Sequence, residues 1–495
     1  MTHPAAHIAA EGRPGAFGRE VPVLGFIALC SLMVRIWWMD NPVVDHDEQF
    51  YSYVATAMLQ GQVPYVDIWD RKPIGLFLLY EAAHALLGRE AWAYLAMANL
   101  FACVGAWLAY RIAAVLADRR TGWVAALLYI IAMTVFGCRG AQSELLFAPL
   151  CLGMVYLAMV HAGSQRAMLL AMFLGGIAIQ IKYTAAPFCA VLGVFVLLED
   201  YRRDPALMRV LGRACIYALA GLAPTIAVAA WYFATGHFGD FFYATFVSIF
   251  ERQPSIGRFH PKTLLVIAPF LLMMGAGTWA RFRLGQTYPR RASALLLVMT
   301  AGALASIYLP SNVLAYYYAF LAPFAVLLAV PFYDLRQRSG WFGAAVLVAG
   351  LIVAGNFPQN IAAGRADVVQ FHALAGRIMA SGERRSLYVF SGPMAVYSAT
   401  GTRPKAKYPF PFHSAEFGEY GALGRPQEQI VREFLALRPA FILARTNFSE
   451  YVRSVTAPMV LGELRAHYVP VAQYLILGDR LTLWQRTPDG PPSAS

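Results

Sequence analysis

The stretch Val44–Tyr51 (VDHDEQFY) directly follows the first long apolar segment of the chain, and Asp70–Pro73 (DRKP) lies further along the same polar interval. Three carboxylates and then a basic pair therefore stand between apolar segments. Ionisable groups are costly near the interior of a membrane, and where they occur they tend to mark functional sites. The interval predicts a membrane protein whose chemistry takes place at the membrane edge.

The composition also predicts a polytopic membrane protein. Of the 495 residues, 59% are hydrophobic and 14% are charged, whereas a soluble domain is about half apolar and a quarter charged. Apolar runs of roughly 17–25 residues recur, which is the length needed to cross a bilayer. The first is too long for a signal-peptide core, so we expect it to be retained. We expect about eleven spans, at 21–39, 91–116, 121–137, 145–161, 167–181, 184–198, 209–235, 263–279, 292–309, 316–333 and 341–355.

The net charge of +12 sets the topology of the chain. Basic residues gather in alternate short loops, which is the pattern of cytoplasmic loops. We therefore expect membrane lipids, and no nucleic acid, as partners of this charge. The loop 40–90 and the part after residue 355 then lie outside. The arginines of the cytoplasmic loops are Arg119, Arg120, Arg166, Arg202, Arg203, Arg209, Arg213, Arg281, Arg283, Arg290, Arg291, Arg336 and Arg338.

The first outer loop contains two apolar helical patterns. Residues 47–60 have one apolar face at helical spacing, and Gly61 ends the pattern. Residues 74–87 are apolar but shorter than a comfortable span. We expect both to be helices lying in the membrane interface, because a full span at 74–87 would place the arginine-rich loops outside.

Two domains are predicted, a membrane domain at 1–355 and a small α/β domain at 356–495 on the outer side. In the second, strands at 387–390, 440–444, 468–472 and 481–484 alternate with helices at 367–379 and 427–437. The six cysteines lie in or beside apolar spans without CxxC spacing, so we expect buried hydrophobic side chains rather than disulfides. They are Cys30, Cys103, Cys138, Cys151, Cys189 and Cys215.

The three acids of the opening stretch differ in their expected roles. Asp45 and Glu48 have the spacing of a capping box at a helix N-terminus. Asp47 is not needed for that box. It either complements the helix dipole or acts as a general base whose pKa is raised by burial.

Two further outer residues, Arg139 and Glu144, allow two interpretations. In one, Glu144 opens a helix and pairs with Arg139. In the other, Glu144 is a second acid that faces Asp47 across a cavity.

Several cations occur on the outer side, where the positive-inside rule would deplete them. Taken singly, each is explained by headgroup contact; together they indicate a bound anion, for which phosphate is the natural candidate. Those concerned are Lys72, Lys182, Arg252, Arg258 and His260. The run Tyr316–Tyr318 is typical of an interfacial aromatic belt. No recognised metal-binding spacing is present near His46; a divalent metal remains an open alternative, and no other cofactor is expected.

The outer motifs together resemble GT-C glycosyltransferases that use polyprenyl-phosphate sugars, a group that includes protein O-mannosyltransferases, aminoarabinose transferases and lipid A or core galacturonosyltransferases. The resemblance covers most of the membrane part. It implies the GT-C fold, a bacterial inner-membrane location and a periplasmic active site. The matching segments are Asp45–Tyr51, Met58–Gly61, Asp70–Pro73, Ser143–Leu146 with the preceding Arg139, Gly175–Lys182, and Tyr316–Tyr318 with the following Pro323.

This resemblance implies roles for single residues. Asp47 would be the catalytic carboxylate and Glu144 the second acid. The lipid phosphate would be held by Lys72 with the help of Arg252 or Arg258. Lys182 and Arg139 are further candidates for binding the phosphate or the donor. Tyr51 and Tyr317 would be aromatic residues on the acceptor side. Arg71 departs from the pattern, because the aminoarabinose enzymes carry an acid there.

The expected function is inverting transfer of a sugar from a polyprenyl-phosphate donor to an acceptor hydroxyl of a glycolipid, polysaccharide or protein. The alternative from another class is a transporter or flippase of a lipid-linked sugar, which predicts internal repeats and broken helices near the midplane. A polysaccharide ligase or polymerase is a third hypothesis, disfavoured by the interfacial helix at 47–60.

Overall fold

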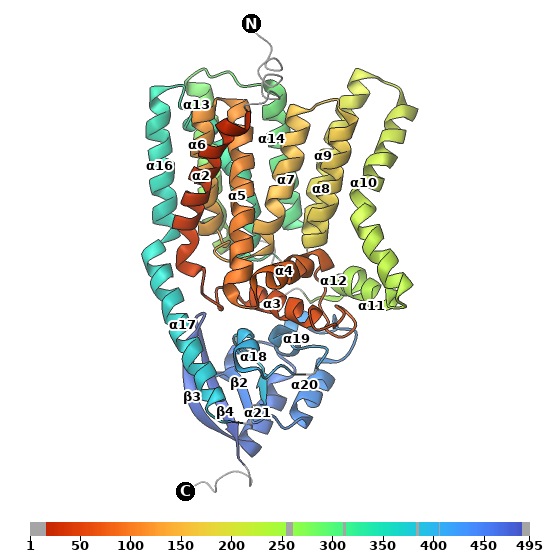
Figure 1. The fold of residues 1–495 in the computed structure, drawn as a ribbon, viewed down its shortest axis with the longest axis vertical. Helices are drawn as coiled ribbons and strands as arrows, with labels where there is room; N and C mark the ends of the chain where they lie inside the picture. Colours follow the sequence, from red (N-terminus) through yellow and green to blue (C-terminus); the bar gives the residue numbers. More distant parts are fainter. Residues whose placement is uncertain (1–15, 254–260, 310–312, 383–385, 405, 488–495) are drawn as a thin grey trace.

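The computed structural model describes residues 16–253, 261–309, 313–382, 386–404 and 406–487. Long helices run side by side in a bundle, and a smaller domain follows beyond one end of it (Figure 1). Among the described residues, seven helices are long and apolar enough to cross a membrane. The protein is therefore a multi-pass membrane protein, as predicted.

Each helix of the bundle overlaps a predicted span. They are α2 (Ala16–Arg35), α5 (Ala91–Leu116), α6 (Arg119–Val135), α7 (Ser143–Val160), α8 (Gln165–Ile181), α9 (Ala186–Arg203), α10 (Leu207–Ala234), α13 (Pro261–Arg283), α14 (Arg290–Tyr308), α15 (Ala322–Leu328) and α16 (Arg338–Gly355). The predicted span 316–333 is not one continuous α-helix. Short 3₁₀ segments, Ala315–Leu321 and Val330–Phe332, flank α15. Pro323 and Pro331 lie in the first turns of α15 and the second 3₁₀ segment and have no N–H to continue a preceding helix.

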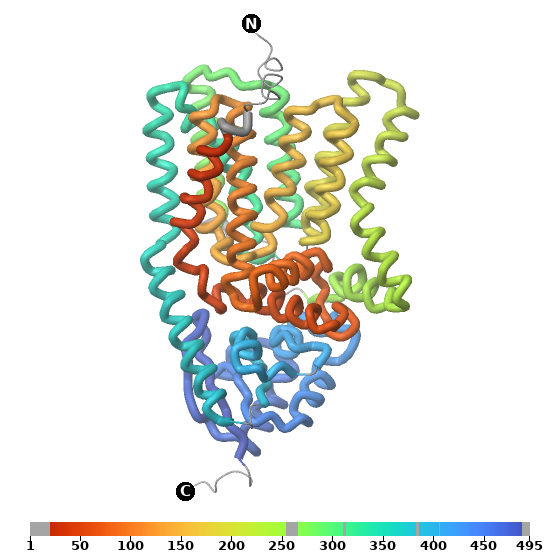
Figure 2. The backbone as a smooth tube through the Cα atoms, viewed as in Figure 1, coloured from red at the N-terminus to blue at the C-terminus, as the bar shows by residue number. Residues whose placement is uncertain are grey.

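Two helices of the first loop lie across the end of the bundle, α3 (His46–Met58) and α4 (Ile74–Leu87). Figure 1 shows them between the bundle and the C-terminal domain, beside α11 (Phe238–Phe242) and α12 (Ser248–Glu251). A π-helical turn, Tyr243–Val247, joins the last two. As predicted, α4 does not pass through the bundle. The trace in Figure 2 places the arginine-rich connections, such as those before α6 and α10, at the opposite end.

The chain enters the C-terminal domain through a nearly continuous helical rod. Asn356, in the left-handed conformation with φ 43°, separates α16 from α17 (Phe357–Met379). This second helix starts earlier than the predicted helix at 367–379. The domain boundary at 355 remains a prediction.

A four-stranded sheet forms the centre of that domain, in the order β1-β2-β4-β3. Its strands are β1 (Leu387–Val389), β2 (Phe441–Arg445), β3 (Tyr468–Ile476) and β4 (Asp479–Arg486). The first pair is parallel and the others antiparallel. The helices are α18 (Ala395–Thr400), α19 (Pro411–Ala415), α20 (Gln427–Ala436) and α21 (Ala457–His467). The predicted small α/β domain is confirmed.

The C-terminal domain packs directly on the first loop. The ring of Phe50 stacks on that of Phe410 with centroids 4.5 Å apart. The backbone N–H of Trp69 donates to the carbonyl of Lys407 at 2.7 Å. The first loop is therefore enclosed between two domains, and that enclosure positions the site.

Candidate active site

The start of α3 fixes the direction of the acidic side chains. The side chain of Asp45 accepts a hydrogen bond from the backbone N–H of Asp47 at 3.0 Å, so the predicted N-cap is present. The prediction that Glu48 completes a capping box is wrong. Glu48 is 1% exposed and lies against Gly140, where a Cβ atom would be 2.0 Å from its Oε1. Because residue 140 is a glycine, the carboxylate of Glu48 has room to lie beside it in the interior.

Asp45 and Glu48 hold their protons more tightly than ordinary acids. Burial, and then the charge of Asp47, raise the pKa of Asp45 to about 6. Burial, and then the charge of Asp45, raise the pKa of Glu48 to about 8. Within the described residues, neither carboxylate oxygen of Glu48 has a hydrogen-bond partner. Glu48 therefore keeps its proton to a higher pH than an ordinary glutamate.

Asp47 lies at the centre of the site. The hydroxyl of Tyr316 donates to its Oδ2 at 2.9 Å, and the ammonium of Lys72 lies 3.8 Å from the same oxygen. Lys72 also donates to the hydroxyl of Tyr51 at 2.9 Å. The side chains of Asp47 and Lys72 remain 19% and 25% exposed, so both are accessible to a ligand.

The expectation that burial raises the pKa of Asp47 is wrong in its net direction. Burial does act upward, but the charge of Lys72 and the hydrogen bond from Tyr316 bring the pKa below its usual range. For Lys72, burial lowers the pKa, and the charges of Asp47 and Asp70 raise it above its usual range. At neutral pH the site therefore contains an ionised carboxylate and a protonated amine.

A second acid–base pair lies at the ends of α7 and α8. Lys182 forms an ion pair with Glu144, and both side chains are buried. The ammonium of Lys182 lies 3.9 Å from the ring centroid of Tyr317 and 5.2 Å from that of Tyr316. Tyr316 thus contacts both pairs, through its hydroxyl and through its ring. The interpretation of this tyrosine run as an aromatic belt does not account for these contacts.

Arg139 lies apart from these pairs. Its guanidinium is 5.9 Å from the ring centroid of Trp38. The alternative in which it pairs with Glu144 is wrong, because Lys182 takes that position.

A third group joins the first loop to the C-terminal domain. Both terminal nitrogens of Arg71 donate to the carboxylate of Glu419, and a terminal nitrogen of Arg252 lies 2.8 Å from the same carboxylate. Burial raises the pKa of Glu419, but the two arginines outweigh it and the net shift is downward. Arg258, also predicted to hold the phosphate, lies outside the described residues.

Sequence reasoning missed the importance of Tyr316, Arg71 and Glu419. Tyr316 stands in a run of three tyrosines, a pattern that also occurs at membrane interfaces and so does not by itself indicate a site residue. Arg71 was noted only as a departure from the family pattern. No local pattern around Glu419 distinguishes it from other acids of the C-terminal domain.

The side chains near Asp47 give no support to a bound divalent metal ion. Within the described part of the chain, no group of three His, Cys, Asp or Glu side chains is arranged to hold a metal ion. Asp47 and Glu144 each have a lysine partner instead.

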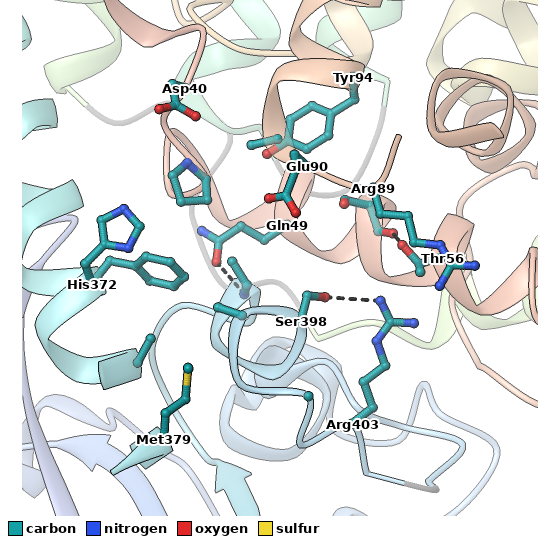
Figure 3. Close-up of a pocket in the computed structure, with 18 of the residues that line it drawn as sticks. Asp40, Gln49, Thr56, Arg89, Glu90, Tyr94, His372, Met379, Ser398 and Arg403 are labelled. Carbon is teal, nitrogen blue, oxygen red and sulfur yellow. Dashed lines mark hydrogen bonds between the residues drawn. The ribbon is translucent and has the colours of Figure 1, made fainter. Parts of the chain in front are cut away.

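Two cavities lie near the site. One of about 950 Å³ lies between α3, the start of α5 and helices α17 and α18; Gln49, Arg89, Tyr94, His372 and Arg403 are among its lining residues (Figure 3). Asp47 and Lys72 are not among the residues that line this cavity. A second, apolar groove of about 480 Å³ runs between α4 and α10; its wall includes Ile74, Leu78, Val228 and Trp231.

The fold is that of the GT-C glycosyltransferases. A family model described as dolichyl-phosphate-mannose-protein mannosyltransferase matches residues 71–231, a segment that contains Lys72, Glu144 and Lys182. No curated protein matches the sequence. The resemblance drawn from the outer motifs is thus confirmed for the fold.

Particular solved structures share this fold over most of the chain. ArnT from Cupriavidus metallidurans in the apo state is 17% identical with a TM-score of 0.57, and the match covers 95% of this chain and 98% of ArnT. ArnT bound to undecaprenyl phosphate is 16% identical with a TM-score of 0.55, covering 96% and 100%. The Archaeoglobus fulgidus oligosaccharyltransferase is 13% identical with a TM-score of 0.51, covering 96% of this chain and 75% of that one.

Proposed function

We propose that this protein is a membrane glycosyltransferase that moves a sugar from a polyprenyl-phosphate-linked donor to an acceptor hydroxyl. The observation that carries the proposal is the pair formed by Asp47 and Lys72, 3.8 Å apart. One is an ionised carboxylate that accepts a proton, and the other is an ammonium group that binds phosphate. The match to ArnT bound to undecaprenyl phosphate supports the donor class.

In the proposed reaction, Asp47 takes the proton of the acceptor hydroxyl. The acceptor oxygen forms a bond to the anomeric carbon, and the bond from that carbon to the phosphate oxygen breaks. The phosphate leaves with the electron pair, and the ammonium of Lys72 stabilises its charge. Attack opposite to the leaving phosphate inverts the anomeric carbon.

Glu144 acts in this proposal through its neighbours. Its ion pair places Lys182 against the ring of Tyr316, and the hydroxyl of Tyr316 donates to Asp47. We therefore assign to Glu144 the positioning of Tyr316, while Tyr51 orients Lys72.

The surroundings support a lipid-linked donor. The wall of the apolar groove between α4 and α10 includes Ile74, two residues after Lys72, so a polyprenyl chain in the groove would hold its phosphate near the ammonium. The arginine-rich loops lie at the opposite end of the bundle (Figure 2), and the positive-inside rule assigns that end to the cytoplasm. We propose a periplasmic site in the inner membrane, with a glycolipid, polysaccharide or protein as acceptor.

The test compares Asp47→Asn and Lys72→Ala in membranes given radiolabelled polyprenyl-phosphate sugars, with mannose, galacturonic acid and aminoarabinose tested separately. Loss of a general base costs about 10²–10⁴-fold in rate, so transfer by Asp47→Asn should fall at least about 100-fold. Asp240→Asn is the control, because Asp240 forms a half-exposed ion pair with Lys407. Normal transfer by both site variants would refute the assignment.

The same assay distinguishes a transporter. If wild-type protein moves the labelled lipid between leaflets and forms no glycosylated product, the flippase hypothesis replaces the enzyme.

A further inference from the structure

One carboxylate of the C-terminal domain binds two arginines from distant parts of the chain. Arg71 precedes α4, Arg252 follows α12, and Glu419 ends a short 3₁₀ turn, Phe417–Glu419. One oxygen of Glu419 lies 3.0 Å from Arg71 and 2.8 Å from Arg252. The side chains of Arg71 and Glu419 are only 10% and 7% exposed, so water screens this group weakly.

At Glu419 itself, two positive charges meet one negative charge. Two guanidinium groups share one carboxylate, and the next residue of the chain is Lys72, whose ammonium faces Asp47. His413 also lies near these charges; burial lowers its pKa to about 3, so it adds no charge at neutral pH. Beside Lys72, the carboxyl groups of Asp47 and Asp70 face the positive charges, so the shortage of acceptors is confined to the Glu419 carboxylate.

The hydrogen bonding of the two arginines is also incomplete. Among the described residues, Nε of Arg71 and Nε of Arg252 are both buried without a hydrogen-bond partner. A buried donor without a partner is unfavourable, because it has lost its hydrogen bonds to water. The two oxygens of Glu419 do not satisfy all the donors that surround them, whereas a phosphate group offers more acceptor oxygens and suits arginine geometry.

We propose that Arg71 and Arg252 form an anion site that Glu419 occupies in the absence of donor, and that the phosphate of the lipid donor displaces Glu419 from it. This inference rests on the proposed function. It extends the phosphate site from Lys72 to Arg71. It also implies that the ion pair between Arg71 of the first loop and Glu419 of the C-terminal domain breaks when the donor binds.

The test measures binding of undecaprenyl phosphate, the lipid without sugar, to purified full-length protein. In Glu419→Gln the phosphate no longer competes with a carboxylate, so the Kd should fall at least about tenfold, which corresponds to about 1.4 kcal/mol. Inorganic phosphate is titrated in parallel; a fall in its Kd as well shows that the gain belongs to the headgroup and not to the lipid chain. The matched control is Glu433→Gln, an acid of the same domain whose partner is Arg425.

A Kd of Glu419→Gln that is unchanged or higher than that of wild type overturns the inference, because an acid that only positions the arginines would weaken binding when removed. If the variant does not fold, the inference is tested instead by amide hydrogen exchange of the wild-type protein with and without the lipid. Faster exchange in residues 411–425 on saturation with undecaprenyl phosphate supports displacement, and unchanged or slower exchange overturns it. Failure of wild type to bind this lipid would refute the proposed function itself.

Discussion

Tyr316 contacts both acid–base pairs of the site and so links them. Its hydroxyl donates to Asp47, and its ring lies against Lys182. Single changes in either pair should therefore alter the other, as is usual for residues in one network.

At the residue scale, Tyr316→Phe tests this connection. Hydrogen bonds to charged groups contribute about 1.5–3 kcal/mol, so we expect transfer to fall roughly 10-fold or more. The pKa of Asp47 should rise, because the hydrogen bond that lowers it is lost. The acid limb of the pH–rate profile should then move to higher pH. Tyr318→Phe is the control, since that hydroxyl bonds to Tyr308; an equal effect in both variants would contradict a specific role.

Glu48 makes the stability of the protein depend on pH. Its pKa is about 8 in the folded protein, against an ordinary value of 4.5, so the folded state binds the proton more tightly. The stabilisation is fully present below pH 4.5 and is lost as pH rises to about 8, by up to about 1.4 kcal/mol per pH unit.

The variant Glu48→Gln should remove this dependence, because glutamine resembles the protonated acid. Melting scans of detergent-solubilised protein are run from pH 5 to 8. The Tm of the variant minus the Tm of wild type should increase as the pH rises. Parallel curves for the two proteins would show that Glu48 is not the group responsible.

At the scale of elements, close packing of α4 on α8 holds the two lysines in register. Lys72 precedes α4 and Lys182 follows α8. A Cβ atom on Gly75 would lie 2.6 Å from the backbone oxygen of Gln180. The glycine therefore sets the separation of the two helices near the site.

Gly75→Ala should force α4 away from α8. Overpacking of this kind costs typically about 1–3 kcal/mol, and displacement of Lys72 should reduce transfer more than stability alone explains. Gly212→Ala in α10 is the control, since nothing lies within 4 Å of a Cβ atom there. Normal transfer and Tm in Gly75→Ala would show that α4 adapts freely.

The elements were largely predictable from the sequence, and the pairing of their charged residues was not. Apolar length located the spans, and the cap at Asp45 located α3. The inward turn of Glu48 depends on space at Gly140, and the partner of Lys182 lies 38 positions away at Glu144. Such contacts form only when the helices pack together, so they cannot be predicted from short stretches of the sequence.

At the scale of the whole molecule, the arrangement predicts that the two ends of the bundle face different compartments. Gln165 and Gln429 are exposed positions in α8 and α20. In a variant without the native cysteines, Gln429→Cys should react with a membrane-impermeant maleimide applied to spheroplasts. Gln165→Cys should react only after permeabilisation. The reverse labelling pattern would place the site on the cytoplasmic side.

The same arrangement has a consequence for biosynthesis. The ribosome makes Asp47 and Arg71 early, but their partners Tyr316 and Glu419 emerge hundreds of residues later. Glu144 and Lys182 meet much sooner. A nascent chain therefore inserts before its first loop has all its partners. A truncated product that ends before Tyr316 contains Asp47 and Lys72, but it lacks both the hydroxyl that binds Asp47 and the carboxylate that binds Arg71.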